Sequence, residues 1–179
     1  MLESAIDIVV DYAPITALPY WQQMAKVGVP PHVTLLYPWR AAPIDGDSLA
    51  TLRAVAAQFT PFEMSMERVE TFPKGVVYVT LEPDSALRSM IRALADVFPD
   101  TPPFGGEFAP RGPTPHCTLA KADGDVDGLE RLRAELAERL DPVLPATITV
   151  DSICVEEEAD SGMWSITTTI PLGSSSAAP

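Results

Sequence analysis

The sequence contains one five-residue motif twice, within two stretches of matching organisation. Residues 31–35 read PHVTL and residues 115–119 read PHCTL, so the second copy follows the first by 84 residues. Both histidines of the chain lie in these two copies. The hydropathy pattern around each copy repeats as well. This duplication constrains the chain to fold as two similar halves, with the two motif strands in equivalent positions.

Alternation of apolar and polar residues predicts strands, and a 3.6-residue apolar period predicts helices. The first half is expected to contain strand 5–12, a helical segment to about residue 27 that Pro19 interrupts, strand 32–39, helix 45–58 and strand 62–71. The second half is expected to contain strand 76–82, helix 84–97, strand 116–122, helix 126–140 and strand 146–156, and a further strand 163–170 closes the domain. Both halves therefore have the same order of elements.

This order predicts an α+β fold of two pseudo-symmetric lobes related by an approximate two-fold axis. Each lobe is expected to be an antiparallel-type sheet with helices outside, and a cleft is expected between the lobes. A chain of 179 residues suits one domain, here residues 1–172, with lobe repeats at about 5–72 and 76–158. The tail 173–179 is expected to be disordered.

Each motif places its histidine and threonine on the same face of a strand, because side chains alternate faces along a strand. His32 and Thr34 therefore share one face, and His116 and Thr118 share the equivalent face. Cys117 turns to the opposite, apolar face, so it is interpreted as a small core residue rather than a nucleophile.

Two such faces across a cleft fit phosphoryl chemistry. One imidazole can take a proton from an attacking hydroxyl or water while the other gives a proton to the leaving oxygen, since a histidine pKa of about 6.5 leaves both forms accessible. Threonine hydroxyls can donate hydrogen bonds to phosphate oxygens. No carboxylate has metal-ligand spacing with the histidines, so no metal and no cofactor is expected. The alternative is that each histidine is a hydrogen-bonded core residue beside a threonine that favours strands.

The paired H-x-T-Φ motifs (Φ is apolar), the proline before each histidine and the duplicated halves resemble the 2H phosphoesterase superfamily. Within it, the closest likeness is to the 2′-5′ RNA ligase-like and 2′,3′-cyclic nucleotide phosphodiesterase group, over roughly residues 5–170. The resemblance implies metal-independent hydrolysis of 2′,3′-cyclic phosphates, or making and breaking of 2′-5′ linkages. It implies that His32 and His116 are catalytic and that Thr34 and Thr118 bind the phosphate. Which histidine is the base, the direction of reaction and the natural substrate stay open.

Lys121, Tyr37 and Trp39, which follow the two motifs, are further candidates for substrate contacts. Lys121 lies where this superfamily often has a basic residue and could contact the phosphate. Simple alternation points it away from His116, so it needs a bulge or a strand end, and a solvated lysine is the alternative. Tyr37 and Trp39 could stack on a nucleobase or pack in the core.

The segment 99–113 has no counterpart of equal length in the first half, and a long loop in a compact domain is often a lid or a binding loop. Phe104 and Arg111 in this loop could supply stacking and charge to a substrate. The acidic run 156–158 is interpreted as a solvated strand end rather than a ligand site.

The net charge of −13, with 25 acidic and 12 basic residues, disfavours binding to long nucleic acids. A small nucleotide or an oligonucleotide end remains compatible as a substrate. No apolar run reaches the roughly 20 residues that span a bilayer, the N-terminus lacks a signal pattern, and two cysteines are too few for a disulfide framework. A cytoplasmic monomer that does not bind membranes is therefore expected.

These observations support two classes of function. The first is a metal-independent phosphoesterase that acts through two-histidine acid–base catalysis on a small nucleotide or RNA end, or, as a variant, on an unrelated small phosphodiester. The second is a non-catalytic protein that binds a nucleotide or RNA end in the same cleft. Two intact His-x-Thr pairs favour the enzyme, because a binder has no need of two proton-transfer groups.

Overall fold

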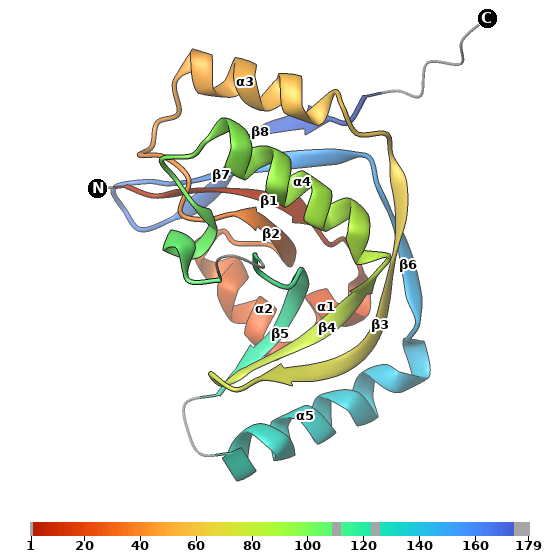
Figure 1. The fold of residues 1–179 in the computed structure, drawn as a ribbon. Coiled ribbons are helices and arrows are strands. Elements are labelled where there is room, and N and C mark those ends of the chain that lie inside the picture. The colour runs from red at the N-terminus through yellow and green to blue at the C-terminus, as the bar shows by residue number, and fades with distance from the viewer. Residues whose placement is uncertain (1, 109–111, 123–125, 174–179) are drawn as a thin grey trace, which may run out of the picture.

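The computed structural model describes residues 2–108, 112–122 and 126–173. Within these residues, one antiparallel sheet of eight strands has the order β6-β3-β4-β5-β2-β1-β7-β8 (Figure 1). The strands are β1 (Ser4–Val9), β2 (His32–Leu36), β3 (Phe62–Phe72), β4 (Val76–Glu82), β5 (His116–Lys121), β6 (Ala146–Val150), β7 (Ser152–Glu158) and β8 (Trp164–Pro171). The tail expected to be disordered, from residue 174 onward, lies outside the described residues.

The helices connect these strands and cover the sheet (Figure 1). They are α1 (Ala13–Thr16), α2 (Pro19–Met24), α3 (Gly46–Ala56), α4 (Asp84–Val97) and α5 (Val126–Leu140), with 3-10 turns η1 (Ala25–Val27), η2 (Pro103–Gly106) and η3 (Asp141–Val143). Pro19 begins α2, because proline lacks the N–H that a helix interior needs but fits its first turn. Helix α4 packs against β2, α5 against β3 and β4, and α2 against β5.

The repeat in the sequence is visible in the sheet, but the expected division into two lobes is not confirmed. The motif strands β2 and β5 are neighbours, and four strands lie on each side of their junction. Strand β3, from the first repeat, pairs with β4 of the second, and β7 of the second pairs with β1 of the first. Each repeat thus contributes its third strand to the other half, so one continuous sheet results.

The strand expected over 146–156 is divided at Asp151 into β6 and β7. Strand β6 pairs with β3 at one edge of the sheet, whereas β7 pairs with β1 in the other half. Because a single residue joins strands that lie in different halves, the sheet must curl strongly. Figure 1 shows this curl where β6 continues into β7 around the molecule.

The apolar side chains of the motif strands are buried in the core. Val33, Leu35, Cys117 and Leu119 are fully buried, and the buried apolar residues of α4 and α5 belong to the same core. Burial of Cys117 agrees with its interpretation as a core residue, and burial raises the pKa of its thiol to about 12. With these residues in the core, the histidines and threonines are left on the opposite face.

Candidate active site

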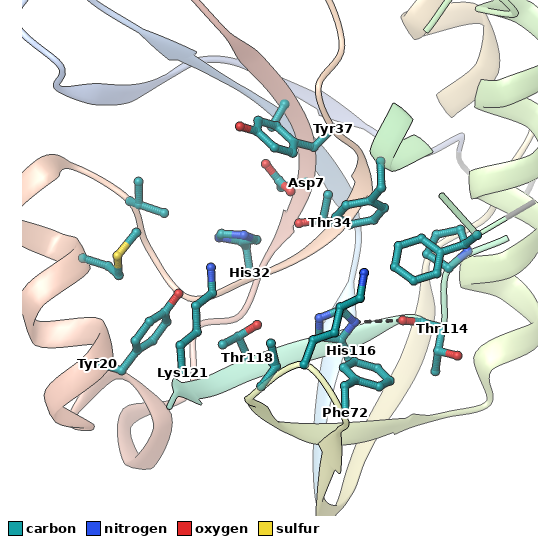
Figure 2. Close-up of a pocket in the computed structure, with 18 of the residues that line it drawn as sticks. Asp7, Tyr20, His32, Thr34, Tyr37, Phe72, Thr114, His116, Thr118 and Lys121 are labelled. Atoms are coloured by element: carbon teal, nitrogen blue, oxygen red, sulfur yellow. Dashed lines mark hydrogen bonds between the residues drawn. The ribbon is translucent and has the colours of Figure 1, made fainter. Parts of the chain in front are cut away.

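The four motif side chains stand together on one face of two adjacent strands. The residues between histidine and threonine in the two motifs pair directly across β2 and β5. In an antiparallel pair, counting outward from this position puts His32 opposite Thr118 and Thr34 opposite His116. Each histidine therefore lies beside the threonine of the other motif, and all four line one cavity of about 650 Å³ (Figure 2).

Aromatic side chains form much of the cavity wall. They come from α2, from the end of β2, from β3, from the loop after α4 and from β8, and comprise Tyr20, Trp21, Tyr37, Phe72, Phe104, Phe108 and Trp164. The Trp21 ring lies edge-on to His32 at 5.4 Å between centroids, and its indole N–H donates to the Thr118 carbonyl at 2.8 Å. Helix α2 is thereby fixed against both motif strands.

Both imidazoles are held in the same way. Nδ1 of His32 lies 2.9 Å from the Pro30 carbonyl oxygen, and Nδ1 of His116 lies 2.8 Å from the Thr114 carbonyl oxygen (Figure 2 for His116). A carbonyl only accepts hydrogen bonds, so Nδ1 carries the proton of each neutral ring. Nε2 is then the nitrogen of each ring that can exchange a proton with a ligand.

The surroundings favour the neutral form of both rings. Burial lowers the pKa of His32, and the Pro30 carbonyl and the Glu156 carboxyl oppose this only in part. Burial also lowers the pKa of His116, with Thr114 opposing the shift and the charges of His32 and Lys121 adding to it. An anionic ligand between the rings would favour the charged form and raise the pKa of the imidazole nearest to it.

A bulge falls on the last residue of each motif. Asp7 pairs with Thr34 and the residue before it with Leu36, so Leu35 is left without a partner in β1. In β4 and β5, the pairing likewise skips Leu119. A bulge changes the direction of the following side chains, and Tyr37 and Lys121, each five residues after its histidine, both line the cavity. The bulge that Lys121 requires to reach the pocket is therefore present.

Of the remaining candidates, the structure places one in the cavity wall and one in the core. Phe104 lines the cavity, and its N–H donates to the Tyr37 carbonyl at 2.6 Å. Trp39 does not line it: the side chain is 2% exposed and packs edge-on against Phe98, with centroids 5.3 Å apart. The chain leaves β2 at Leu36, so strand alternation does not extend to Trp39. Arg111 lies outside the described residues.

Two acidic side chains of the cavity were not expected from the sequence. Asp7 is 1% exposed and Glu156 is 2% exposed, and both line the cavity near His32. The interpretation of the run 156–158 as solvated is thus wrong for Glu156, because this residue is buried in the cavity wall. Asp7 did carry a signal, since it is the single acid within the apolar segment AIDIVV.

Among the described residues, no group of three or more His, Cys, Asp or Glu side chains is placed to hold a metal ion. No helix in that part of the chain is long and apolar enough to cross a membrane.

Residues 14–162 match the family model of the 2′-5′ RNA ligase superfamily. The chain belongs to this superfamily. Membership supports an activity of the 2H phosphoesterase type, as the two motifs imply. A relative named "Putative phosphoesterase GK0864", from Geobacillus kaustophilus (strain HTA426), is 26% identical over 149 residues, which cover 81% of this chain and 80% of the relative.

Solved structures of proteins with low sequence identity to this chain have a similar fold. The protein TT0787 of Thermus thermophilus has a TM-score of 0.58 at 17% identity, with 98% of this chain and 100% of that chain covered. Escherichia coli LigT complexed with 3′-AMP has a TM-score of 0.59 at 13% identity, with 96% and 98% covered. LigT complexed with NADP⁺ has a TM-score of 0.56 at 12% identity, with the same coverage. These likenesses confirm the α+β fold with its curled antiparallel sheet.

Proposed function

We propose that this protein hydrolyses a 2′,3′-cyclic phosphate or a 2′-5′ phosphodiester of a small nucleotide or RNA end, without a metal, with His32 and His116 as general acid and base. The observation that carries this proposal is that two imidazoles and two threonine hydroxyls lie next to one another on one cavity wall. Both imidazoles are tied at Nδ1 to backbone carbonyls, which leaves two equivalent Nε2 atoms for proton transfer.

The reaction needs one ring to be neutral and the other to be charged. Nε2 of the neutral ring takes a proton from the attacking water as its oxygen bonds to phosphorus. The bond between phosphorus and the leaving oxygen breaks, and Nε2 of the charged ring gives that oxygen a proton. Thr34 and Thr118 donate to non-bridging oxygens, and the Lys121 ammonium offsets the developing charge. The two rings have then exchanged protonation states, which solvent restores.

The dimensions and lining of the cavity support a small substrate. A volume of about 650 Å³ suits a mononucleotide or a dinucleotide. Aromatic walls offer stacking surfaces for a base. LigT has been crystallised with 3′-AMP and with NADP⁺, which supports nucleotide binding in this fold. Both cysteines are free and buried, in keeping with a protein that works in the reducing cytoplasm.

A substrate panel tests this proposal. It should contain 2′,3′-cyclic nucleotides, 2′-5′ and 3′-5′ dinucleotides and ADP-ribose cyclic phosphate, each assayed with and without a chelator. Turnover of a cyclic phosphate or a 2′-5′ linkage that survives the chelator is expected. Strict dependence on an added divalent metal would contradict the mechanism. Tight nucleotide binding without any turnover would support the non-catalytic alternative instead.

A further inference from the structure

The repeat makes positions in the two halves equivalent residue by residue. Asp7 is the β1 partner of Thr34, and Tyr78 is the β4 partner of Thr118. Asp7 and Tyr78 therefore occupy equivalent places beside the two motifs. In the same way, Glu156 lies two residues beyond the β7 partner of Asp7, and Phe72 lies two residues beyond the β3 partner of Tyr78.

These equivalent places hold opposite chemistry. Phe72 and Tyr78 are stacked with centroids 4.0 Å apart, and both rings lie edge-on to His116, at 4.9 and 5.5 Å. The corresponding places in the other half hold the two carboxyls of Asp7 and Glu156. Figure 2 shows Asp7 with Thr34 near His32 at one end of the pocket and Phe72 beside His116 at the other.

The two carboxyls are buried without enough protein partners. Both carboxyl oxygens of Asp7 and Oε1 of Glu156 are inaccessible to solvent and have no partner at hydrogen-bond geometry among the described residues; the Thr34 hydroxyl favours the charged form of Asp7 but offsets its burial only in part. Burying an unpaired acid costs stability, whereas an aromatic pair, as in the other half, avoids that cost. Burial raises the pKa of each carboxyl to about 7. Both side chains line the cavity, so a small rotation of each carboxyl would let a bound ligand supply the missing partners.

We propose that Asp7 and Glu156 form a subsite that binds the ribose hydroxyl next to the phosphate, a group that a 2′-5′ diester carries as substrate and that a 2′,3′-cyclic phosphate gains when its ring opens. The inference rests on the proposed function. Thr34 would contact the phosphate, and Asp7 is its direct neighbour across β1 and β2, so only atoms within a few bonds of phosphorus can reach the subsite. In a ribose 2′- or 3′-ester, the donor at that distance is the hydroxyl on the adjacent carbon. A hydroxyl both donates and accepts, so it pairs with a carboxyl in either protonation state.

A matched pair of nucleotides tests the subsite. Binding of adenosine 2′-monophosphate and of 3′-deoxyadenosine 2′-monophosphate is measured by titration calorimetry at pH 7. The wild type should bind the nucleotide with the hydroxyl at least about tenfold more tightly, because the analogue leaves buried carboxyls unpaired. Asp7→Leu and Glu156→Met should reduce this ratio to about twofold or less.

Glu157→Gln is the matched control, because Glu157 adjoins Glu156 but does not line the cavity and instead accepts from the Ile44 N–H and the Thr167 hydroxyl. This variant should keep the wild-type ratio. If Asp7→Leu does not fold, Asp7→Ala removes the carboxyl without adding bulk, and its ratio should also fall.

Two results would overturn the subsite: a wild-type ratio near one, or a ratio that persists in the Asp7 and Glu156 variants. Turnover of a 2′,3′-cyclic nucleotide, measured in parallel, tests the proposed function separately. If turnover occurs and neither nucleotide binds, the subsite alone is wrong. If neither turnover nor binding occurs, the proposed function is wrong and the subsite falls with it.

Discussion

At the scale of single residues, the site is organised by short hydrogen bonds that fix direction. The backbone two residues before each histidine holds Nδ1, so both rings present the same nitrogen to the cavity. The threonines are fixed by strand register, each opposite the other motif's histidine. By contrast, Asp7 and Glu156 have carboxyl oxygens without a hydrogen-bond partner at good geometry. These two acids are therefore the residues of the site that are expected to lower stability.

Asp7→Asn should therefore stabilise the protein, and more so at high pH. Burial raises the pKa of Asp7 to about 7, with the Thr34 hydroxyl opposing the shift and with Glu156 and His32 nearby. A folded-state pKa above the ordinary value means that stability is lost as pH rises from about 4 to about 7. The variant should gain about 2–3 kcal/mol in unfolding free energy relative to wild type between pH 5 and pH 8. Urea unfolding of both proteins at pH 5 and at pH 8 measures this. A difference in unfolding free energy between variant and wild type that is the same at the two pH values would contradict it.

Thr34→Ala and Thr118→Ala should each lower kcat/KM by about 10- to 100-fold, which is less than loss of a proton-transfer group, because a threonine contributes one hydrogen bond to a phosphate oxygen. Thr→Ser at either position should restore most of the activity, since it keeps the hydroxyl. Steady-state kinetics on the best substrate of the panel decides this. Serine variants as slow as the alanine variants would show that the threonines act by packing.

At the scale of elements, sequence patterns predicted the features that depend only on neighbouring residues. Helices 84–97 and 126–140 are confirmed because their apolar periods are long. The break of strand 146–156 at Asp151 and the exchange of third strands depend on which distant strands pair, and no local pattern encodes that pairing. The same limit hid Glu156, whose face is decided by β1 and β8. The four motif residues could be predicted because strand alternation alone sets their common face.

The turn between β3 and β4 offers a test at this scale. Gly75 has φ of +86°, and a Cβ atom there would lie 2.4 Å from the Ala122 carbonyl oxygen. Gly75→Ala should therefore lower the unfolding free energy by roughly 1–3 kcal/mol, because the alanine is strained and displaces the end of β5.

Gly46→Ala is the control, since Gly46 lies in α3 with open space around its Cβ position. Alanine there should be neutral or stabilise the protein by up to about 1 kcal/mol. Chemical denaturation of both variants measures the contrast. Equal effects of the two substitutions would contradict the close packing of the β3–β4 turn on β5.

At the scale of the whole molecule, charge and shape restrict what can reach the site. The net charge is −13 and the chain contains three lysines, so attraction of a phosphate must come from the cavity itself. Of the two lysines that line it, Lys74 contacts Glu107, while Lys121 has no ion pair among the described residues. One cavity with one free ammonium suits one or two phosphates.

Affinity for a mononucleotide or dinucleotide should accordingly change by less than about tenfold between 50 and 200 mM salt, since few counterions are released. Long single-stranded RNA should bind no more tightly than a short oligonucleotide with the same end. Fluorescence anisotropy over a salt series measures both. A steep loss of affinity for long RNA across this range would mean that many phosphates are contacted and would contradict a small substrate.

The central claim is that His32 and His116 together carry the reaction, and the pH dependence of kcat/KM with both histidine variants tests it most directly. Since burial lowers both pKa values, the wild-type profile on a 2′,3′-cyclic nucleotide or a 2′-5′ dinucleotide should be bell-shaped with its maximum below about pH 6.5. His32→Ala and His116→Ala should each lower the maximum by about 10²- to 10⁴-fold or more, with folding intact by circular dichroism. A variant that retains activity within about tenfold of wild type, or a profile with one limb only, would contradict paired acid–base catalysis.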